Sequence, residues 1–314
     1  MALMFINGES VPAKSGQTYE VRNPATGEVV DTAPKGGVED VRAAIAAAEA
    51  AFPAWRDTAP EARGRLLHQG AERVQQKIDE LAVLETQEQG KSVAESKREI
   101  EHFLHGLEFY AGLASKIRGA YVPLPDGKMY GMVIKQPIGV CGGIVPWNFP
   151  ITLMGTKVGP ALAAGNTMIV KPASTTPLTA ARSVELLNQA GLPKGVLNLV
   201  SGPGGVVGEE LLRNPRVRRV AFTGETGTGK HVAEVAGREM KRLTLELGGS
   251  DPMIVCDDAD LDRAVTAASV GRFYNCGQAC LAIKRLYLFA SIYDQFVEKL
   301  IGKAKRLKLG NGLN

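Results

Sequence analysis

The chain has 314 residues, 45% of them hydrophobic, which is enough for about two ordinary globular domains with a sizeable core. Its net charge of +4 comes from 37 basic and 33 acidic residues interspersed along the chain, and this pattern argues against a nucleic-acid partner. Residues 1–8 lack the basic start of a secretory signal, and no stretch is long and apolar enough to cross a bilayer. Four cysteines without metal-ligand spacing fit a reducing compartment. We therefore expect a soluble, cytoplasmic protein with no membrane partner and no metal.

The first third of the chain predicts a hairpin, a set of helices and a second hairpin. Two short alternating segments within residues 17–32 flank a turn that ends at Gly27. Apolar residues then recur at helical spacing, with Gly90 as a helix stop and Ser92 as a cap. These helical segments are residues 38–55, 61–90 and 94–117. Residues 119–138 read as two strands around Asp126-Gly127, which predicts a projecting hairpin.

From Gly139 the chain repeats an apolar strand, a turn and a helix, which predicts an α/β fold with a doubly wound, Rossmann-like parallel sheet. The expected strands are 140–145, 167–171, 196–200, 219–222 and 243–247, and the expected helices are 153–164, 177–190, 206–213 and 229–240. Such sheets bind ligands beyond the carboxyl ends of their strands. Strands at 252–255 and 285–289, each followed by a helix, begin another α/β layer.

The candidate nucleophile is Cys280, in Phe273-Tyr-Asn-Cys-Gly-Gln-Ala-Cys280. Only a thiolate attacks, so the role needs a polar, accessible setting, and an isolated cysteine is more often a small packing residue. Cys276 stands four residues earlier and is either a redox partner or another packing residue.

Three strand ends carry further candidates. Asn148 lies between two prolines in Pro146-Trp-Asn-Phe-Pro150, as an amide with two donors or as simple turn chemistry. Lys171-Pro-Ala-Ser174 sets a cation and a hydroxyl where a ribose or phosphate would lie, although Ser174 or Thr175 also suits a helix cap. Glu246, between leucines, suits a general base if it is desolvated, or else is a solvated edge residue.

Two segments invite rival interpretations. Gly224 with Gly229-Lys230 has P-loop spacing, but His231 stands where the magnesium-binding hydroxyl belongs, so a nucleoside triphosphatase is disfavoured. Either way, a glycine turn opening a helix offers N–H groups to a phosphate. The acidic run 257–262 lacks the glycine of a calcium loop, and we expect it to cap the following helix.

Five motifs together resemble the NAD(P)-dependent aldehyde dehydrogenase superfamily in order and spacing, along the whole chain. They are Pro146-Trp-Asn-Phe-Pro150, Lys171-Pro-Ala-Ser174, Phe222-Thr-Gly224, Leu245-Glu-Leu-Gly-Gly249 and the segment ending at Cys280. The resemblance implies that Cys280 attacks an aldehyde and that Asn148, with the Cys280 backbone N–H, holds the oxyanion. The thiohemiacetal then passes hydride to NAD or NADP, and Glu246 activates the water that hydrolyses the thioester.

The resemblance also assigns a cofactor site and a domain plan. The implied cofactor-lining residues are Trp147, Asn148, Lys171, Pro172, Ala173, Ser174, Gly224, Glu225, Gly229 and Leu247. Residues 1–118 and 139–249 would form the dinucleotide-binding domain, 119–138 an oligomerisation hairpin, and 250–314 part of the catalytic domain. A homo-oligomer, either a dimer or a tetramer, is expected for the complete chain.

The chain departs from the family pattern at three side chains. Ser174 replaces a glutamate that is common in NAD-preferring relatives, and its lack of charge favours NADP acceptance. Glu225 replaces a small hydroxyl residue near the pyrophosphate, so it must swing outward or weaken cofactor binding. Thr156 replaces the arginine of the otherwise similar succinate-semialdehyde dehydrogenases, which makes a simple or hydroxylated aldehyde at least as good a candidate as a semialdehyde.

Family chains continue beyond the length seen here, which predicts a C-terminally truncated chain with an unfinished catalytic domain and an open sheet edge. The alternative to an active enzyme is therefore a truncated, inactive chain that binds nucleotide or pairs with full-length subunits.

Overall fold

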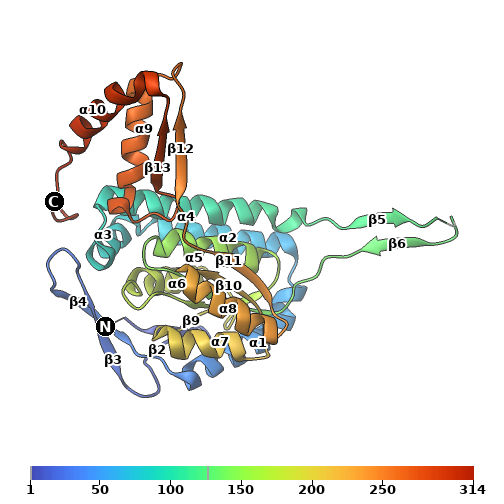
Figure 1. Cartoon of the computed structure of the whole chain (residues 1–314). Helices are drawn as coiled ribbons and strands as arrows, with labels where there is room; N and C mark the ends of the chain where they lie inside the picture. Colours follow the sequence, from blue (N-terminus) through green and yellow to red (C-terminus); the bar gives the residue numbers. More distant parts are fainter. Residues whose placement is uncertain (1, 126) are drawn as a thin grey trace.

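The computed structural model describes residues 2–125 and 127–314 and is built on a seven-stranded sheet in the order β11-β10-β7-β8-β9-β1-β2 (Figure 1). Its parallel strands are β7 (Val140–Ile144), β8 (Thr167–Lys171), β9 (Leu197–Leu199), β10 (Val217–Thr223) and β11 (Arg242–Glu246). The antiparallel strands β1 (Met4–Ile6) and β2 (Glu9–Val11) complete one edge. The predicted doubly wound parallel sheet is confirmed.

Helices cover both faces of this sheet, so its middle strands are buried on both sides. Along β8, Met168 and Val170 join the core beneath one helical layer, whereas Ile169 joins the core on the other face. The first layer contains α5 (Pro150–Ala163) and α6 (Leu178–Gln189), and the second contains α1 (Val38–Asp57), α7 (Glu209–Arg213) and α8 (Thr226–Arg238). The alternation explains why β8 reads as an unbroken apolar run up to Lys171.

Outside α5 and α6 lies a further set of helices, α2 (Pro60–Gln75), α3 (Ile78–Gln89) and α4 (Val93–Leu113). The predicted helical stretch 61–90 is thus two helices, because the backbone leaves helical geometry at Lys77. The predicted stop and cap are confirmed: Gly90 is left-handed with φ 97°, and the Ser92 hydroxyl accepts from the Glu95 N–H. Helix α4 ends in a short 3₁₀ turn, η1 (Ala114–Lys116).

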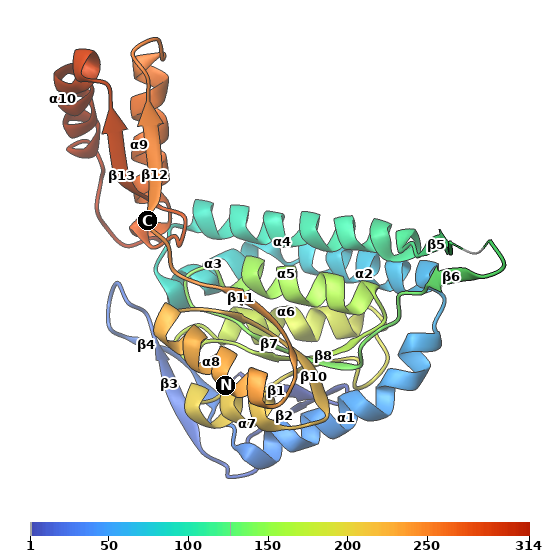
Figure 2. The same cartoon turned by 45° about the vertical axis from the view of Figure 1, so that its right-hand side comes forward.

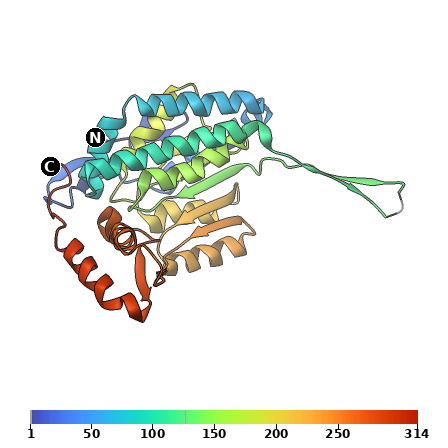
Figure 3. The same cartoon turned by 90° about the horizontal axis from the view of Figure 1, so that it is seen from above.

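Both predicted hairpins are present. Strands β3 (Thr18–Arg22) and β4 (Val29–Pro34) pair beside the main sheet. Strands β5 (Ala120–Pro123) and β6 (Tyr130–Val133) form a long arm that projects from the body (Figures 1 and 3). In the predicted turn of this arm, Asp126 lies outside the described residues. Within residues 2–125 and 127–314, no helix is long and apolar enough to span a membrane.

The last part of the chain forms a small parallel sheet that stands apart from the main sheet (Figure 2). It contains β12 (Asp251–Val255) and β13 (Ile283–Leu288), with α9 (Leu261–Phe273), α10 (Tyr293–Ala304) and the 3₁₀ turns η3 (Tyr274–Gly277) and η4 (Ala290–Ile292). Phe296 is fully buried in its core. The end of the chain returns to the main body, where the Gly312 carbonyl accepts from the Val93 N–H at 3.1 Å.

The predicted starts of α9, α6 and α7 agree with the structure only in part. Asp260 caps α9 through the Arg263 N–H, as the acidic run predicts. The predicted cap of α6 by Ser174 or Thr175 is wrong, because the buried carboxylate of Glu88, on α3, accepts from the first N–H groups of α6. The helix predicted at 206–213 begins with a π-helical turn, η2 (Gly204–Gly208), and becomes α7 only at Glu209.

Candidate active site

The candidate residues gather at the carboxyl ends of adjacent parallel strands. Strand register pairs Ile144 with Lys171 on one side and with Phe222 on the other, and it pairs Thr223 with Glu246. The chain after each of these positions therefore leaves the sheet at one edge, where doubly wound folds bind ligands. The structure thus brings four of the five predicted motifs to a common edge.

Asn148 connects this edge to the loop that carries Cys280. Its side-chain Nδ2 donates to the Gln278 carbonyl at 2.8 Å, and its own carbonyl accepts from Asn275 Nδ2 at 2.8 Å. The turn between the two prolines therefore presents the amide to the loop that carries the candidate nucleophile, which is two residues after Gln278. Trp147, beside it, is exposed.

The loop before Cys280 has an unusual backbone. Asn275, Cys276 and Gly277 are consecutive left-handed residues, with φ values of 52°, 55° and 77°. This region is costly for side chains other than glycine, and such conformations gather at functional sites. Cys276 and Cys280 are both free and exposed, and partial burial raises the pKa of the Cys276 thiol. Exposure of Cys280 satisfies one condition for a nucleophilic thiol.

Lys284, which sequence reasoning missed, ties this loop to the end of β11. Its ammonium donates to the Cys280 carbonyl at 3.1 Å and to the Gly249 carbonyl at 2.7 Å. The nucleophile's backbone is thereby bound to the segment that follows Glu246. A lysine at the start of a strand carries no sequence signal for such a contact.

Glu246 faces a cavity of about 540 Å³ beside α5 that Lys157 and Thr156 also line. Lys157 Nζ donates to the Thr223 hydroxyl at 2.7 Å, and burial lowers its pKa to about 8 while the charge of Glu246 opposes that shift. Glu246 itself is exposed, as expected for a solvated residue at the sheet edge. Cys280 lies outside the residues that line this cavity.

The Lys171 motif offers one buried cation and one exposed hydroxyl. Lys171 Nζ donates to the carbonyl of buried Pro172 at 2.7 Å, and burial lowers its pKa to about 8. Ala173 is half-buried, and the exposed Ser174 donates to the Gly202 carbonyl at 3.1 Å. Both side chains thus rest on backbone carbonyls, with no acidic residue at position 174.

Glu225 occupies the N-terminus of α8. Its carboxylate accepts from the N–H groups of Gly227 at 2.9 Å and Thr228 at 3.1 Å, and these bonds lower its pKa. The side chain therefore folds back onto the helix and takes the donors that a phosphate would otherwise use. The Gly229 Cα packs so closely on Leu247 that a Cβ there would lie 2.4 Å from a leucine methyl, which brings these two predicted residues together.

The P-loop alternative does not match the structure. Only Gly224 and Glu225 separate β10 from α8, so Gly229 and Lys230 lie inside the helix instead of in a phosphate-wrapping loop. His231 pairs with Glu209 at 2.9 Å on the surface.

The chain belongs to the aldehyde dehydrogenase family, whose family model matches residues 11–314. Among curated relatives, it is 47% identical over 311 residues to the glutarate-semialdehyde dehydrogenase of Pseudomonas putida, covering 98% of this chain and 64% of the relative. It is 45% identical over 310 residues to the NADP-dependent succinate-semialdehyde dehydrogenase GabD of Escherichia coli, covering 99% and 64%.

Solved structures agree with this placement. An E. coli NADP-dependent enzyme superposes with a TM-score of 0.98 at 44% identity, covering 100% of this chain and 65% of the other. The NAD⁺ complex of betaine aldehyde dehydrogenase from Staphylococcus aureus superposes with a TM-score of 0.96 at 37% identity, covering 100% and 62%. The chain thus spans about two thirds of the length of the relatives it matches.

Proposed function

We propose that the protein oxidises an aldehyde to a carboxylic acid with NAD or NADP as hydride acceptor, through a covalent cysteine intermediate. The observation that carries this proposal is the bond from Asn148 Nδ2 to the Gln278 carbonyl, which aims an amide donor at the loop of Cys280. Family membership and the NADP- and NAD⁺-linked relatives support the cofactor class.

In this proposal the Cys280 thiolate adds to the aldehyde carbon, and the resulting oxyanion accepts from Asn148 Nδ2 and the Cys280 N–H. The thiohemiacetal carbon would lose its hydride to the nicotinamide of NAD or NADP, when one is bound, and this loss would leave a thioester on Cys280. Glu246 then takes a proton from water, which attacks the thioester, releasing the acid and restoring the thiolate. In this structure Glu246 is exposed and lines a cavity that Cys280 does not line.

The cofactor fit is favourable at Lys171 and opposed at Glu225. We assign Lys171 and Ser174 to the adenosine ribose, with Pro172 and Ala173 shaping the strand end, because a buried amine and an exposed hydroxyl lie together there. Uncharged Ser174 does not repel a 2′-phosphate, so we propose that NADP is accepted. Trp147, Gly224, Gly229 and Leu247 complete the assigned cofactor wall.

We also propose the domain roles. Residues 1–118 and 139–249 would bind the dinucleotide, and 250–314 would carry the nucleophile, since Cys280 lies between α9 and β13. The projecting hairpin, 119–138, would contact another subunit. A simple or hydroxylated aldehyde is at least as good a candidate substrate as the semialdehydes named for the relatives, because Thr156 lines the cavity beside Glu246 where an arginine would bind a carboxylate.

The test is aldehyde-dependent reduction of NAD and NADP, followed by absorbance with the purified protein. We expect turnover with a short aldehyde, at least as fast with NADP as with NAD. Cys280→Ala should abolish it, with a loss of at least about 10³-fold, because the covalent step disappears. The matched variant Cys276→Ala should retain it. Equal turnover in wild type and Cys280→Ala would overturn the mechanism, and cofactor binding without turnover would favour a nucleotide-binding, inactive chain.

A further inference from the structure

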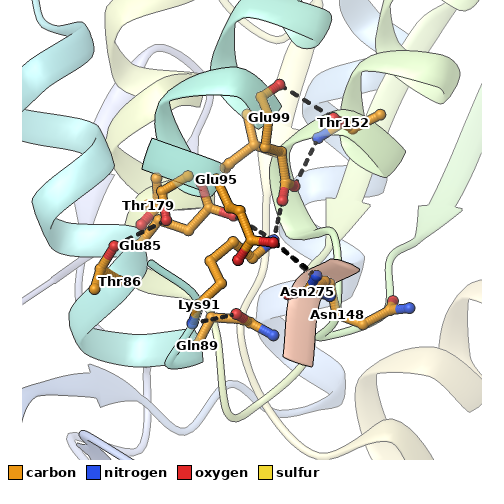
Figure 4. A network of polar contacts seen from close by, with 12 residues as sticks. Glu85, Thr86, Gln89, Lys91, Glu95, Glu99, Asn148, Thr152, Thr179 and Asn275 are labelled. Carbon is orange, nitrogen blue, oxygen red and sulfur yellow. Dashed lines mark hydrogen bonds and ion pairs between the residues drawn. The ribbon is translucent and has the colours of Figure 1, made fainter. Parts of the chain in front are cut away.

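A buried ionic cluster lies directly behind Asn148 (Figure 4). Lys91, in the turn between α3 and α4, is fully buried, and its ammonium pairs with Glu99 and, at 3.2 Å, with Glu85, which are also fully buried. Removing charges from water costs several kcal/mol each, and their pairing offsets that cost only when the geometry is well satisfied. The proposed chemistry uses none of these three residues.

Lys91 reaches the turn that carries the candidate oxyanion donor. Its Nζ donates to the Asn148 carbonyl at 2.9 Å and lies 4.4 Å from the centre of the Phe149 ring. The Phe149 ring in turn stacks on Tyr274, with centroids 5.6 Å apart and planes at 24°. A buried cation over an aromatic face is attracted by the ring. Lys91 thus holds the Asn148–Phe149 peptide through both a hydrogen bond and a ring contact.

Helix α4, which follows Lys91, also contacts the loop on the other side of Asn148. The Asn275 N–H donates to Glu95 at 3.0 Å, while Asn275 Nδ2 donates to the Asn148 carbonyl that Lys91 also contacts. Glu99, besides pairing with Lys91, accepts from the Ile151 N–H at 2.9 Å and from Thr152, at the start of α5. Residues 91–99 therefore contact Asn148 itself, the chain that follows it, and Asn275 across from it (Figure 4).

We propose that Lys91 is a positioning residue that orients the Asn148 side chain toward the oxyanion formed at Cys280. This proposal rests on the function proposed above. The Asn148 carbonyl is fixed by two donors, and its amide is fixed by the Gln278 carbonyl. Without the ammonium, one of the two constraints on the peptide plane is lost, and the buried side chains of Glu85 and Glu99 lose the cation between them. The peptide that bears the amide donor then moves.

The expected effect is on acyl chemistry, because a donor must lie 2.7–3.1 Å from the developing oxyanion to stabilise it. A misplacement of about 1 Å costs on the order of 10²-fold in rate. Alkylation of the same thiol by iodoacetamide forms no oxyanion. The ratio of acylation to alkylation rates at Cys280 therefore reports donor placement separately from thiol accessibility.

The experiment measures both rates on the purified protein, with p-nitrophenyl acetate as acyl donor and mass spectrometry to locate the label on Cys280. Lys91→Met keeps the length of the side chain and removes its charge, and we expect the ratio to fall at least tenfold. Glu88→Gln is the matched control, since Glu88 is equally buried on α3 but binds α6 and not Asn148. It should leave the ratio within twofold of wild type.

A second variant tests the same positioning role in case Lys91→Met does not fold. Asn275→Gly keeps the left-handed backbone and removes the other donor to the Asn148 carbonyl, so the ratio should fall in the same direction. An unchanged ratio in both variants, or an equal fall in Glu88→Gln, overturns the positioning role. Wild-type Cys280 that is alkylated but never acylated overturns the proposed function itself.

Discussion

At the scale of single residues, charges at the candidate site are held by backbone groups. Glu225 binds two helix N–H groups, Lys284 two carbonyls, and Lys171 the carbonyl of Pro172. The motifs predicted that their residues lie at one edge of the sheet, because parallel strands bring their carboxyl ends to the same edge. They did not predict the partners, since hydrogen bonds to backbone groups far along the chain leave no pattern in the side chains.

Glu225→Ser is predicted to tighten dinucleotide binding. The glutamate carboxylate occupies the α8 N–H groups and repels a pyrophosphate, whereas serine caps a helix equally well without charge. The helix end then attracts the pyrophosphate without competition from a carboxylate, so the dissociation constant of NADP should fall by roughly two- to fivefold. Titration calorimetry measures this.

Adenosine, which has no phosphate, is the control ligand for this variant, and its affinity should not change. Weaker NADP binding in Glu225→Ser would show that the carboxylate assists the cofactor instead of competing with it.

At the scale of elements, the helices and strands were largely predictable from periodicity, while their mutual supports were not. The helical face of α3 that carries Leu81 and Ala82 also carries Glu85 and Glu88, and all four are buried. A glutamate on the apolar face of a predicted helix is the sequence feature that could have indicated a buried carboxyl group at Glu85, at Glu88 and, on α4, at Glu99. The partners of Glu88 and Glu99 are the first N–H groups of α6 and α5, and the sequences of α3 and α4 do not specify where those helices lie.

The buried carboxylate of Glu88 predicts a pH-dependent stability. Burial raises its pKa to about 7 from 4.5, so the folded state binds the proton more tightly than the unfolded state does. The unfolding free energy therefore falls as pH rises from 4.5 to 7, by about 3 kcal/mol from this group.

Glu88→Gln removes this contribution, so the difference in unfolding free energy between wild type and variant should shift by about that amount across the interval. Urea denaturation near pH 4.5 and near pH 7 measures the shift. Glu28→Gln, at an exposed turn position, should show no such shift. A constant difference for Glu88→Gln would mean that the two N–H groups of α6 keep this carboxylate ionised.

At the scale of the whole molecule, the sequence predicted the projecting hairpin, but not how the end of the chain returns to the turn between α3 and α4. Gly312 packs against the carbonyl of Lys91 so closely that a Cβ there would lie 2.4 Å from it. This contact joins segments more than 200 residues apart through backbone atoms alone. Hydrophobic patterning is silent about such contacts, because no side chain carries them.

The hairpin is predicted to be a subunit contact. Met132 and Ile134 on the arm are 66% and 70% exposed. The arm extends away from the body, so the body does not bury these side chains (Figure 3). Apolar side chains gathered on a projecting strand mark an interaction surface. Met132→Ser with Ile134→Ser should therefore lower the native mass measured by sedimentation equilibrium by at least half.

Met240→Ser with Leu309→Ser is the matched control, because these side chains are even more exposed, at 91% and 97%, but belong to segments outside residues 119–138. The control should keep the wild-type mass, since it removes as much exposed apolar surface without touching β6. A fall in mass in both pairs would indicate nonspecific association through apolar surface, and no fall in either would remove the arm from the interface. Only a loss confined to the hairpin pair fits an arm that binds a neighbouring subunit.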